Sequence, residues 1–194
     1  MSVRVAWGIT GSGDHLAESV ETMVSLKKKH DLHVDVILSK AGEAVVDRYR
    51  LRDTLMQNFA KVFIEKDANT PFLVAPLQQG KYDLLLICPA TANTAAKIAD
   101  GIADSLLTNC VAQTMKARVP TYIFPVDQQP GEIVTILPSG RKLALSMRDI
   151  DLENASKLRR MKGITVLSAP RDIEGIMLSF LRKTDEQGCL NGEH

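Results

Sequence analysis

Three short segments of this chain have the residue types to bind an anion. They are "TGSG" at 10–13, "SKAG" at 39–42 and "PATANT" at 89–94, and each follows an apolar run and precedes a helix-like stretch. Backbone N–H groups at the start of a helix attract a phosphate, and small side chains let it approach. A single loop of this kind could be a simple turn, since glycine is often needed for backbone reasons alone. Three together favour a phosphate-bearing ligand.

The motifs do not by themselves identify the ligand. "TGSG" matches neither the GxGxxG fingerprint nor the P-loop, which needs a lysine after its last glycine. In "PATANT", the side chain of Asn93 offers both a carbonyl and an amide, which suits the edge of a heterocycle. Thr91 or Asn93 could equally serve only to cap the following helix. The residues alone leave these two interpretations open.

Four apolar runs predict the strands that must position these segments: 3–9, 33–38, 82–88 and 121–124. The third run is continuously apolar, as is typical of a parallel strand that is covered on both faces. Helix-like segments lie between the runs, and this alternation predicts an α/β fold with a parallel sheet and helices on both sides. The carboxyl ends of parallel strands share one edge, where ligands bind in open sheets.

The helical segments have recognisable limits. We expect one helix over 40–57, and a short helix opened by Pro71, because proline suits a first turn. The alanine-rich stretch after the third strand predicts a helix that is interrupted near Asp100-Gly101 and restarts with Asp104 as its N-cap.

Residues 132–147 interrupt the α/β alternation. They read as two strands joined by a turn at Pro138-Ser139-Gly140, and so predict an inserted β-hairpin. A helix, a last strand and a closing helix follow. We therefore expect a single domain over 1–182 and a flexible C-terminal tail over 183–194, where no apolar periodicity is left.

Composition narrows the class of protein. The net charge of the 194 residues is +1, which gives no reason to expect nucleic acid or an anionic membrane as a partner. No stretch approaches the roughly 20 apolar residues that span a bilayer. Cys88, Cys110 and Cys189 form no CxxC pair, which argues against an iron–sulfur cluster, another metal site or a disulfide framework. These features predict a cytoplasmic protein without a metal.

The stretch "PATANTAAKIADGIADSLLT" resembles the "P-A-S-A-N-T…K-I-A-x-G…D-x-L-L-T" signature of the homo-oligomeric flavin-containing cysteine decarboxylase superfamily. The likeness extends to "GITGS", "SKAG" and the segment after the fourth strand, roughly three-quarters of a chain of ordinary domain size. Thr91 replaces the more usual serine and keeps the hydroxyl. The resemblance implies a flavodoxin-like (Rossmann-like) three-layer sandwich that binds FMN.

The same resemblance implies where FMN would bind. Gly11, Ser12 and Gly13 would lie near its ribityl-phosphate, and Ser39 and Lys40 would approach it from the second strand end. The third segment would hold phosphate and ring, and the backbone near the fourth strand end would also touch FMN. These last positions are Pro89, Thr91, Ala92, Asn93, Thr94 and Val126.

Two departures from the superfamily's other branches favour one activity. The decarboxylases use a histidine before the third strand, whereas the histidines here are His15, His30, His33 and His194. The prenyltransferases carry "R-E-x-P-L" after the fourth strand, where this chain has "PVDQQPGE". The region from "IFPVDQQPGE" to "ENASKL" instead resembles the archaeoflavoprotein and dihydromethanopterin reductase branch.

That branch implies an FMN-dependent oxidoreductase that reduces dihydromethanopterin or a related dihydropterin to its tetrahydro form. The electron donor would be NAD(P)H, a free flavin or a redox protein, and the assembly a homo-oligomer built from trimers. Alternatives are an FMN electron carrier that accepts electrons from ferredoxin, a flavin-dependent cysteine decarboxylase and a flavin-storage assembly. No catalytic acid or base is assigned. Asp127 could relay a proton, but a turn-forming role is the simpler interpretation.

Overall fold

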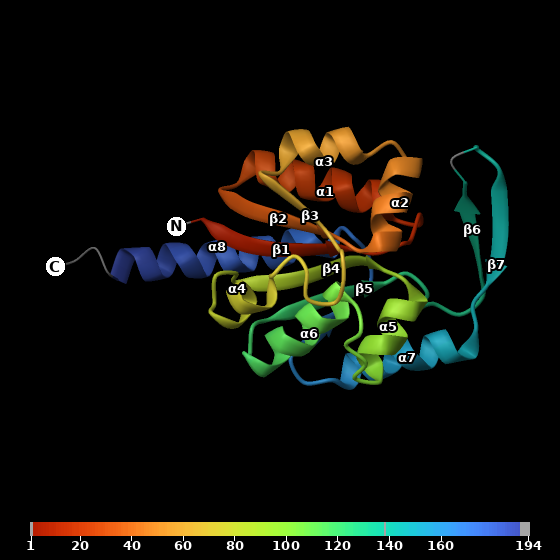
Figure 1. Cartoon of the computed structure of the whole chain (residues 1–194). Helices are drawn as coiled ribbons and strands as arrows, with labels where there is room; N and C mark the ends of the chain where they lie inside the picture. Colours follow the sequence, from red (N-terminus) through yellow and green to blue (C-terminus); the bar gives the residue numbers. More distant parts are fainter. Residues whose placement is uncertain (1, 138, 191–194) are drawn as a thin grey trace.

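The protein is built around one six-stranded parallel sheet, as a computed structural model of residues 2–137 and 139–190 shows (Figure 1). Its strands run in the order β3-β2-β1-β4-β5-β8, and each neighbouring pair is parallel. The order reverses between β1 and β4, which makes the carboxyl ends of these two strands the switch point of the sheet. The strands are β1 Val3–Ile9, β2 Leu32–Leu38, β3 Lys61–Ile64, β4 Leu84–Ala90, β5 Thr121–Pro125 and β8 Ile164–Val166.

Helices cover both faces of the sheet and complete a three-layer sandwich (Figure 1). Each face has its own apolar cluster, one containing Trp7 and Leu86 and the other containing Leu85 and Ile87. Neighbouring residues of β4 therefore point to opposite faces, which is why its sequence is continuously apolar. The first cluster is covered by α1 Leu16–Lys29, α2 Lys40–Arg48, α3 Arg52–Asn58 and α8 Asp172–Leu190, and the second by α4 Val74–Gln78, α5 Ala92–Ala99, α6 Leu106–Lys116 and α7 Asp149–Arg160.

The inserted hairpin stands beyond the carboxyl edge of the sheet (Figure 1). Its strands, β6 Glu132–Ile136 and β7 Lys142–Ser146, pair only with each other, in antiparallel register. The parallel sheet, the helices on both faces and this hairpin confirm the predicted fold class. Pro138 of the predicted turn lies outside the described residues, and Gly140 has the left-handed φ of 81° that favours glycine.

Three predicted helix limits were wrong. The helix expected over 40–57 is two helices, since the chain turns at Arg50, whose φ is 57°. The helix expected from Pro71 begins at Val74, because 71–73 first carry the chain away from a turn closed between Asp67 and Thr70. The N-cap of α6 is Ser105 rather than Asp104. The Ser105 hydroxyl accepts from the Thr108 amide and forms a capping box, whereas the Asp104 carboxylate pairs with Lys97.

The end of the chain is helical further than its sequence pattern indicates. Helix α8 continues to Leu190, so most of the segment assigned to a tail belongs to this helix, and residues 191–194 lie outside the described part. Across the described residues, no helix combines the length and the apolar character needed to cross a membrane.

Candidate functional site

The three loops singled out in the sequence meet at the carboxyl edge of the sheet. The Thr10 hydroxyl donates to the Pro89 carbonyl at 2.9 Å and accepts from the Thr91 amide at 2.8 Å. These bonds join the loop after β1 to the loop after β4, across the switch point of the sheet. The two segments that the sequence places 81 residues apart therefore form one surface.

Backbone hydrogen bonds add the neighbouring strand ends to this surface. The Ser39 amide donates to the Ile9 carbonyl at 3.0 Å, and the Val126 amide donates to the Ala90 carbonyl, also at 3.0 Å. All eleven predicted site residues thus lie on the ends of four adjacent strands, β2, β1, β4 and β5. Their contacts with a ligand stay a prediction.

The loop over Gly11–Gly13 keeps its backbone donors free. The N–H groups of Gly11, Ser12 and Gly13 donate to no acceptor among residues 2–137 and 139–190. A Cβ on Gly11 would lie 2.6 Å from the Cβ of Ala41, and one on Gly13 would overlap the hydroxyl of Tyr49. Glycine is therefore required here so that the loop can pack against α2. Three neighbouring amides without an acceptor are what a helix-start anion site needs.

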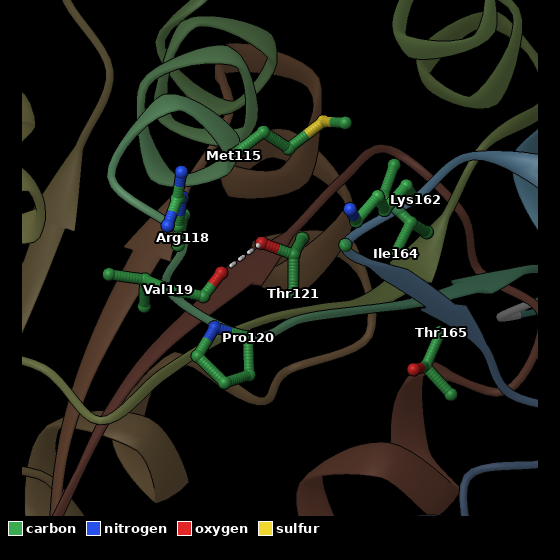
Figure 2. A pocket seen from close by; sticks show the side chains of 9 residues that line it. Met115, Arg118, Val119, Pro120, Thr121, Lys162, Ile164 and Thr165 are labelled. Atoms are coloured by element: carbon green, nitrogen blue, oxygen red, sulfur yellow. Dashed lines mark hydrogen bonds between the residues drawn. The ribbon is translucent and has the colours of Figure 1, made fainter.

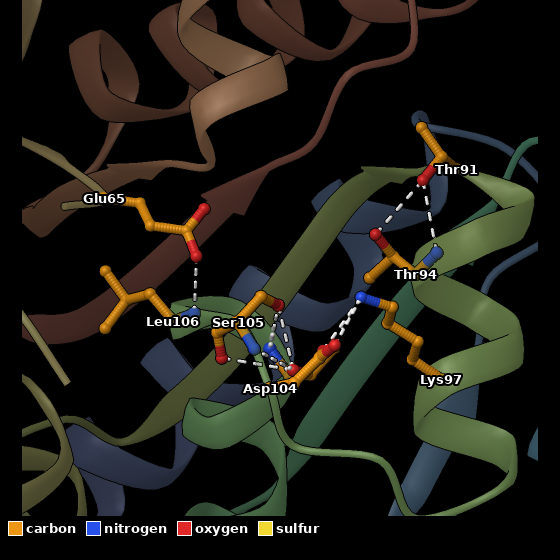
Figure 3. Close-up of polar contacts among 8 residues, drawn as sticks. Glu65, Thr91, Thr94, Lys97, Asp104, Ser105 and Leu106 are labelled. Atoms are coloured by element: carbon orange, nitrogen blue, oxygen red, sulfur yellow. Dashed lines mark hydrogen bonds and ion pairs between the residues drawn. The ribbon is translucent and has the colours of Figure 1, made fainter. Parts of the chain in front are cut away.

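The hydroxyls of Ser39 and Thr91 cap helices. Ser39 accepts from the Gly42 amide at 2.9 Å at the start of α2. Thr91 accepts from the Thr94 amide at 3.2 Å at the start of α5, and its oxygen lies 3.1 Å from the Thr94 hydroxyl (Figure 3). The capping role that the sequence left open is therefore real. It does not compete with ligand binding, because a hydroxyl that accepts from an amide still has a proton to donate.

An internal carboxylate already fills two of the helix starts. One oxygen of Glu65 accepts from the Lys40 amide at 3.0 Å. The other accepts from the Leu106 amide at 2.8 Å, the bond drawn in Figure 3. Glu65 is 9% exposed and follows β3 directly. It joins the first residue of α2 to the first residue of α6. Sequence reasoning missed it, although its position after the short apolar run "VFI" was a usable signal.

A second carboxylate, Asp127, lies at the start of α5. It is partly buried just after β5, beside the backbone N–H of Ala92. Burial raises the pKa of Asp127, and the nearby carboxylates of Asp151 and Asp14 raise it further. The Ala92 amide and Arg148 lower the pKa of Asp127, but the net shift is upward. Among these strand ends, the donors of α2, α5 and α6 thus face internal acids, unlike those of 11–13.

The hairpin is held against the glycine loop by two contacts. The Thr135 hydroxyl donates to a carboxylate oxygen of Asp14 at 2.8 Å, and the Tyr49 hydroxyl donates to the Ile136 carbonyl at 3.2 Å. Thr135 is buried by this docking, whereas Val134 and Ile136 are 60% and 59% exposed on the opposite face of β6. The hairpin therefore borders the site and presents an apolar face away from it.

His15 follows the glycine loop at the start of α1 and was not singled out in the sequence. Its φ of 58° is unusual for a residue other than glycine, and its Nδ1 lies 2.8 Å from a carboxylate oxygen of Glu18. The ring packs edge-on against Phe124, with 5.1 Å between centroids. These contacts hold the ring against α1 and β5.

A large cavity lies at the opposite edge of the sheet. It has a volume of about 750 Å³ and is lined by residues that include Met115, Arg118, Thr121, Lys162 and Thr165 (Figure 2). Helices α6 and α7 both end beside it, and cations offset the partial negative charge of helix ends. Arg118 and Lys162 are thereby explained without a ligand. The Thr121 hydroxyl is already bonded to the Val119 carbonyl and to Thr114.

The comparisons with known proteins show the family of this chain. A sequence model described as Flavoprotein matches residues 1–186. The chain belongs to the flavoprotein family. An uncharacterized protein of Methanocaldococcus jannaschii is 55% identical over 95% of this chain and 100% of its own length. The likeness to the flavin-containing superfamily noted in the sequence is thereby confirmed.

Two relatives of this flavoprotein carry the name dihydromethanopterin reductase (acceptor). The one from M. jannaschii is 36% identical over 86% of this chain and 72% of its own length. The one from Methanosarcina mazei is 38% identical over 70% of this chain and 59% of its own length. This flavoprotein thus spans about three-fifths of the second reductase.

A solved structure of similar fold is that of Burkholderia xenovorans DmrB in complex with FMN, described as a cubic protein cage for redox transfer. It is 32% identical and covers 95% of this chain and 98% of its own, with a TM-score of 0.80. The FMN-dependent cysteine decarboxylase TvaF is 20% identical with a TM-score of 0.62, a likeness of fold alone.

Proposed function

We propose that this flavoprotein binds FMN at the carboxyl edge of its sheet and reduces a dihydropterin, such as dihydromethanopterin, to the tetrahydro form. The observation that carries the proposal is the free donor set of Gly11–Gly13 at the switch point, beside helix starts that already face acids. The two relatives named dihydromethanopterin reductase and the FMN complex of DmrB support the choice of cofactor and substrate.

The residues at this edge fit FMN. The amides of 11–13, which have no acceptor in the described residues, would donate to the phosphate. Glycine at position 11 keeps that loop in place, because a side chain there would collide with Ala41. Ser39 and Thr91 would each donate a hydroxyl proton, and the exposed Asn93 would offer its amide to the ring edge. Pro89, Ala92, Thr94 and Val126 would contribute backbone and shape, and Lys40 a positive charge. Bound FMN would supply the redox chemistry, and the protein would orient it.

The proposal includes the assembly and the electron supply. Homologous DmrB is described as a cage, and we propose that this chain likewise forms a homo-oligomer built from trimers. The exposed apolar face of the hairpin, with Val134 and Ile136, is consistent with burial against other subunits. NAD(P)H, a free flavin or a redox protein would reduce the cofactor.

An anaerobic absorption experiment tests the function. The purified protein should show oxidised-flavin bands near about 375 and 450 nm, which bleach on reduction and return when dihydromethanopterin is added. Bands that bleach and return only with another acceptor would contradict the pterin reductase and favour an electron carrier. A protein that takes up no FMN would overturn the whole proposal.

A further inference from the structure

We propose that Asp127 is the proton donor of the reduction, an inference that rests on the proposed function. Its carboxyl lies where β5 meets the candidate site, beside the Ala92 amide at the start of α5. The preceding residue, Val126, donates its amide to the Ala90 carbonyl at 3.0 Å, which fixes the backbone of Asp127 against the end of β4. The carboxyl therefore has a defined position at the site.

The loop that carries Asp127 is also anchored on its other side. The side-chain amide of Gln128 donates to the Leu167 carbonyl at 2.8 Å and accepts from Arg159 at 2.6 Å. Gln128 is 6% exposed, so these bonds are sheltered from water. These bonds fix the residues on both sides of Asp127. A group that transfers a proton must be held within hydrogen-bond reach of its acceptor.

The charges around Asp127 favour its protonated form. Asp14 faces it from the loop after β1, and Asp151 and Arg148 face it from α7. Arg148 makes two hydrogen bonds to Asp151, at 2.8 and 2.7 Å, and so offsets part of that negative charge, but its effect on the pKa of Asp127 is smaller than that of burial and of the two acids. Burial and the two other acids raise the pKa of Asp127 above that of an ordinary aspartate. An acid with a raised pKa keeps more of its proton near neutral pH.

The chemistry of the reaction requires such a donor. Reducing the C=N bond of a dihydropterin adds a hydride to carbon and a proton to nitrogen. The hydride, with its two electrons, would be supplied by the reduced flavin, which would be oxidised. The proton comes from the Asp127 carboxyl, which becomes a carboxylate and regains a proton from water. Atoms and electrons balance without a further reactant.

His15 is the obvious competitor for this role. It follows the glycine loop, but its Nδ1 faces Glu18 and its ring packs against Phe124. These contacts hold the imidazole on the α1 side of β5, whereas Asp127 adjoins the loop that carries Asn93. The roles of His15 and Asp127 can be distinguished by experiment, because asparagine can replace either residue without straining the backbone.

The test compares Asp127→Asn with His15→Asn in the flavin-loaded protein. Asparagine keeps the size of Asp127, and at position 15 it tolerates the left-handed backbone. In Asp127→Asn, reoxidation of the reduced flavin by dihydromethanopterin should slow about 10²–10⁴-fold, the usual contribution of a general acid. Reoxidation by ferricyanide, which takes electrons alone, should be unchanged. His15→Asn should behave as the parent protein in both assays.

The pH profile gives a second criterion. With the parent protein the pterin-dependent rate should fall as pH rises through the pKa of Asp127, because only the protonated acid donates. Asp127→Asn should lack this limb. Asp14→Asn should move it to lower pH, because one of the charges that raise the pKa of Asp127 is removed. In the flavin-free protein, infrared difference spectra against Asp127→Asn should follow the same carboxyl, protonated above the usual aspartate range.

The outcomes separate this inference from the proposed function. If Asp127→Asn binds FMN and is reoxidised by the pterin at the parental rate, or if His15→Asn alone slows that step, Asp127 is not the donor. A carboxyl that titrates in the ordinary range would overturn the inference as well. If the parent protein binds no FMN or never reacts with the pterin, the proposed function itself has failed.

Discussion

The two edges of the sheet differ in what they offer a ligand. The carboxyl edge has three backbone amides at Gly11–Gly13 that donate to no acceptor in the described residues, with the helix-capping hydroxyls of Ser39 and Thr91 beside them. The opposite edge has a cavity of about 750 Å³, with the cations Arg118 and Lys162. Those cations face the ends of α6 and α7, whose carbonyls carry the partial negative charge. We therefore base the proposed site on unsatisfied donors and not on empty volume.

The same difference appears in how internal acids are used. Glu65 and Asp127 face the starts of α2, α5 and α6, and the glycine loop alone among these strand ends is left for an anion from outside. An internal carboxylate at a helix start places a negative charge beside the free N–H groups, as a bound phosphate would. If FMN binds as proposed, these internal acids leave the glycine loop as the place for its phosphate.

The largest effect on FMN affinity is expected from Gly11→Val. The added side chain would clash with Ala41, and overpacking of this kind costs about 1–3 kcal/mol. If that strain displaces the loop, FMN affinity should fall about 10–100-fold. Fluorescence titration of the flavin-free protein measures it. Gly175→Ala is the control, because a Cβ there meets nothing within 4 Å. Unchanged affinity in Gly11→Val would remove the glycine loop from the site.

Glu65→Gln should have the next largest effect. The variant keeps one acceptor oxygen for the amides of Lys40 and Leu106 and turns an NH₂ toward the other, which costs about 1–3 kcal/mol of unfolding free energy. Urea denaturation of the flavin-free protein measures this loss. The partly exposed Glu43, which pairs with Arg52, is the matched control. Glu43→Gln should cost less than about 1 kcal/mol. Equal losses in the two variants would contradict the bridging role of Glu65.

Thr135→Val tests whether the hairpin borders the site. The change keeps the shape of the side chain and removes its bond to Asp14, worth about 0.5–1.5 kcal/mol. Limited proteolysis should then cut the hairpin faster, with a smaller loss of FMN affinity than Gly11→Val gives. If the rate of cleavage stays the same, the contact does not hold the hairpin.

The smallest effect is expected at the opposite edge. Arg118→Ala and Lys162→Ala, alone or together, should leave FMN affinity within about twofold, because these cations lie at helix ends and not at the anion site. The same fluorescence titration applies. A tenfold loss in the double variant would place the phosphate in the large cavity and reverse the comparison.

The sequence predicted the parts of this arrangement that depend on local pattern. Apolar runs and small residues at strand ends gave the parallel sheet and the segments at 10–13, 39–42 and 89–94. It could not predict the partners of Glu65, whose two amides lie 25 and 41 residues away. The same holds for Asp127, since the carboxylates around it come from other elements. The break at Arg50 was missed because helical periodicity continues across it.

A crystal structure of the protein grown with FMN tests the central claim most directly. The account predicts the phosphate within hydrogen-bonding distance of the amides of Gly11, Ser12 and Gly13, with the ring beside Asn93 and the Asp127 carboxyl. A phosphate bound to Arg118 and Lys162, with the amides of 11–13 bonded to water alone, would contradict it.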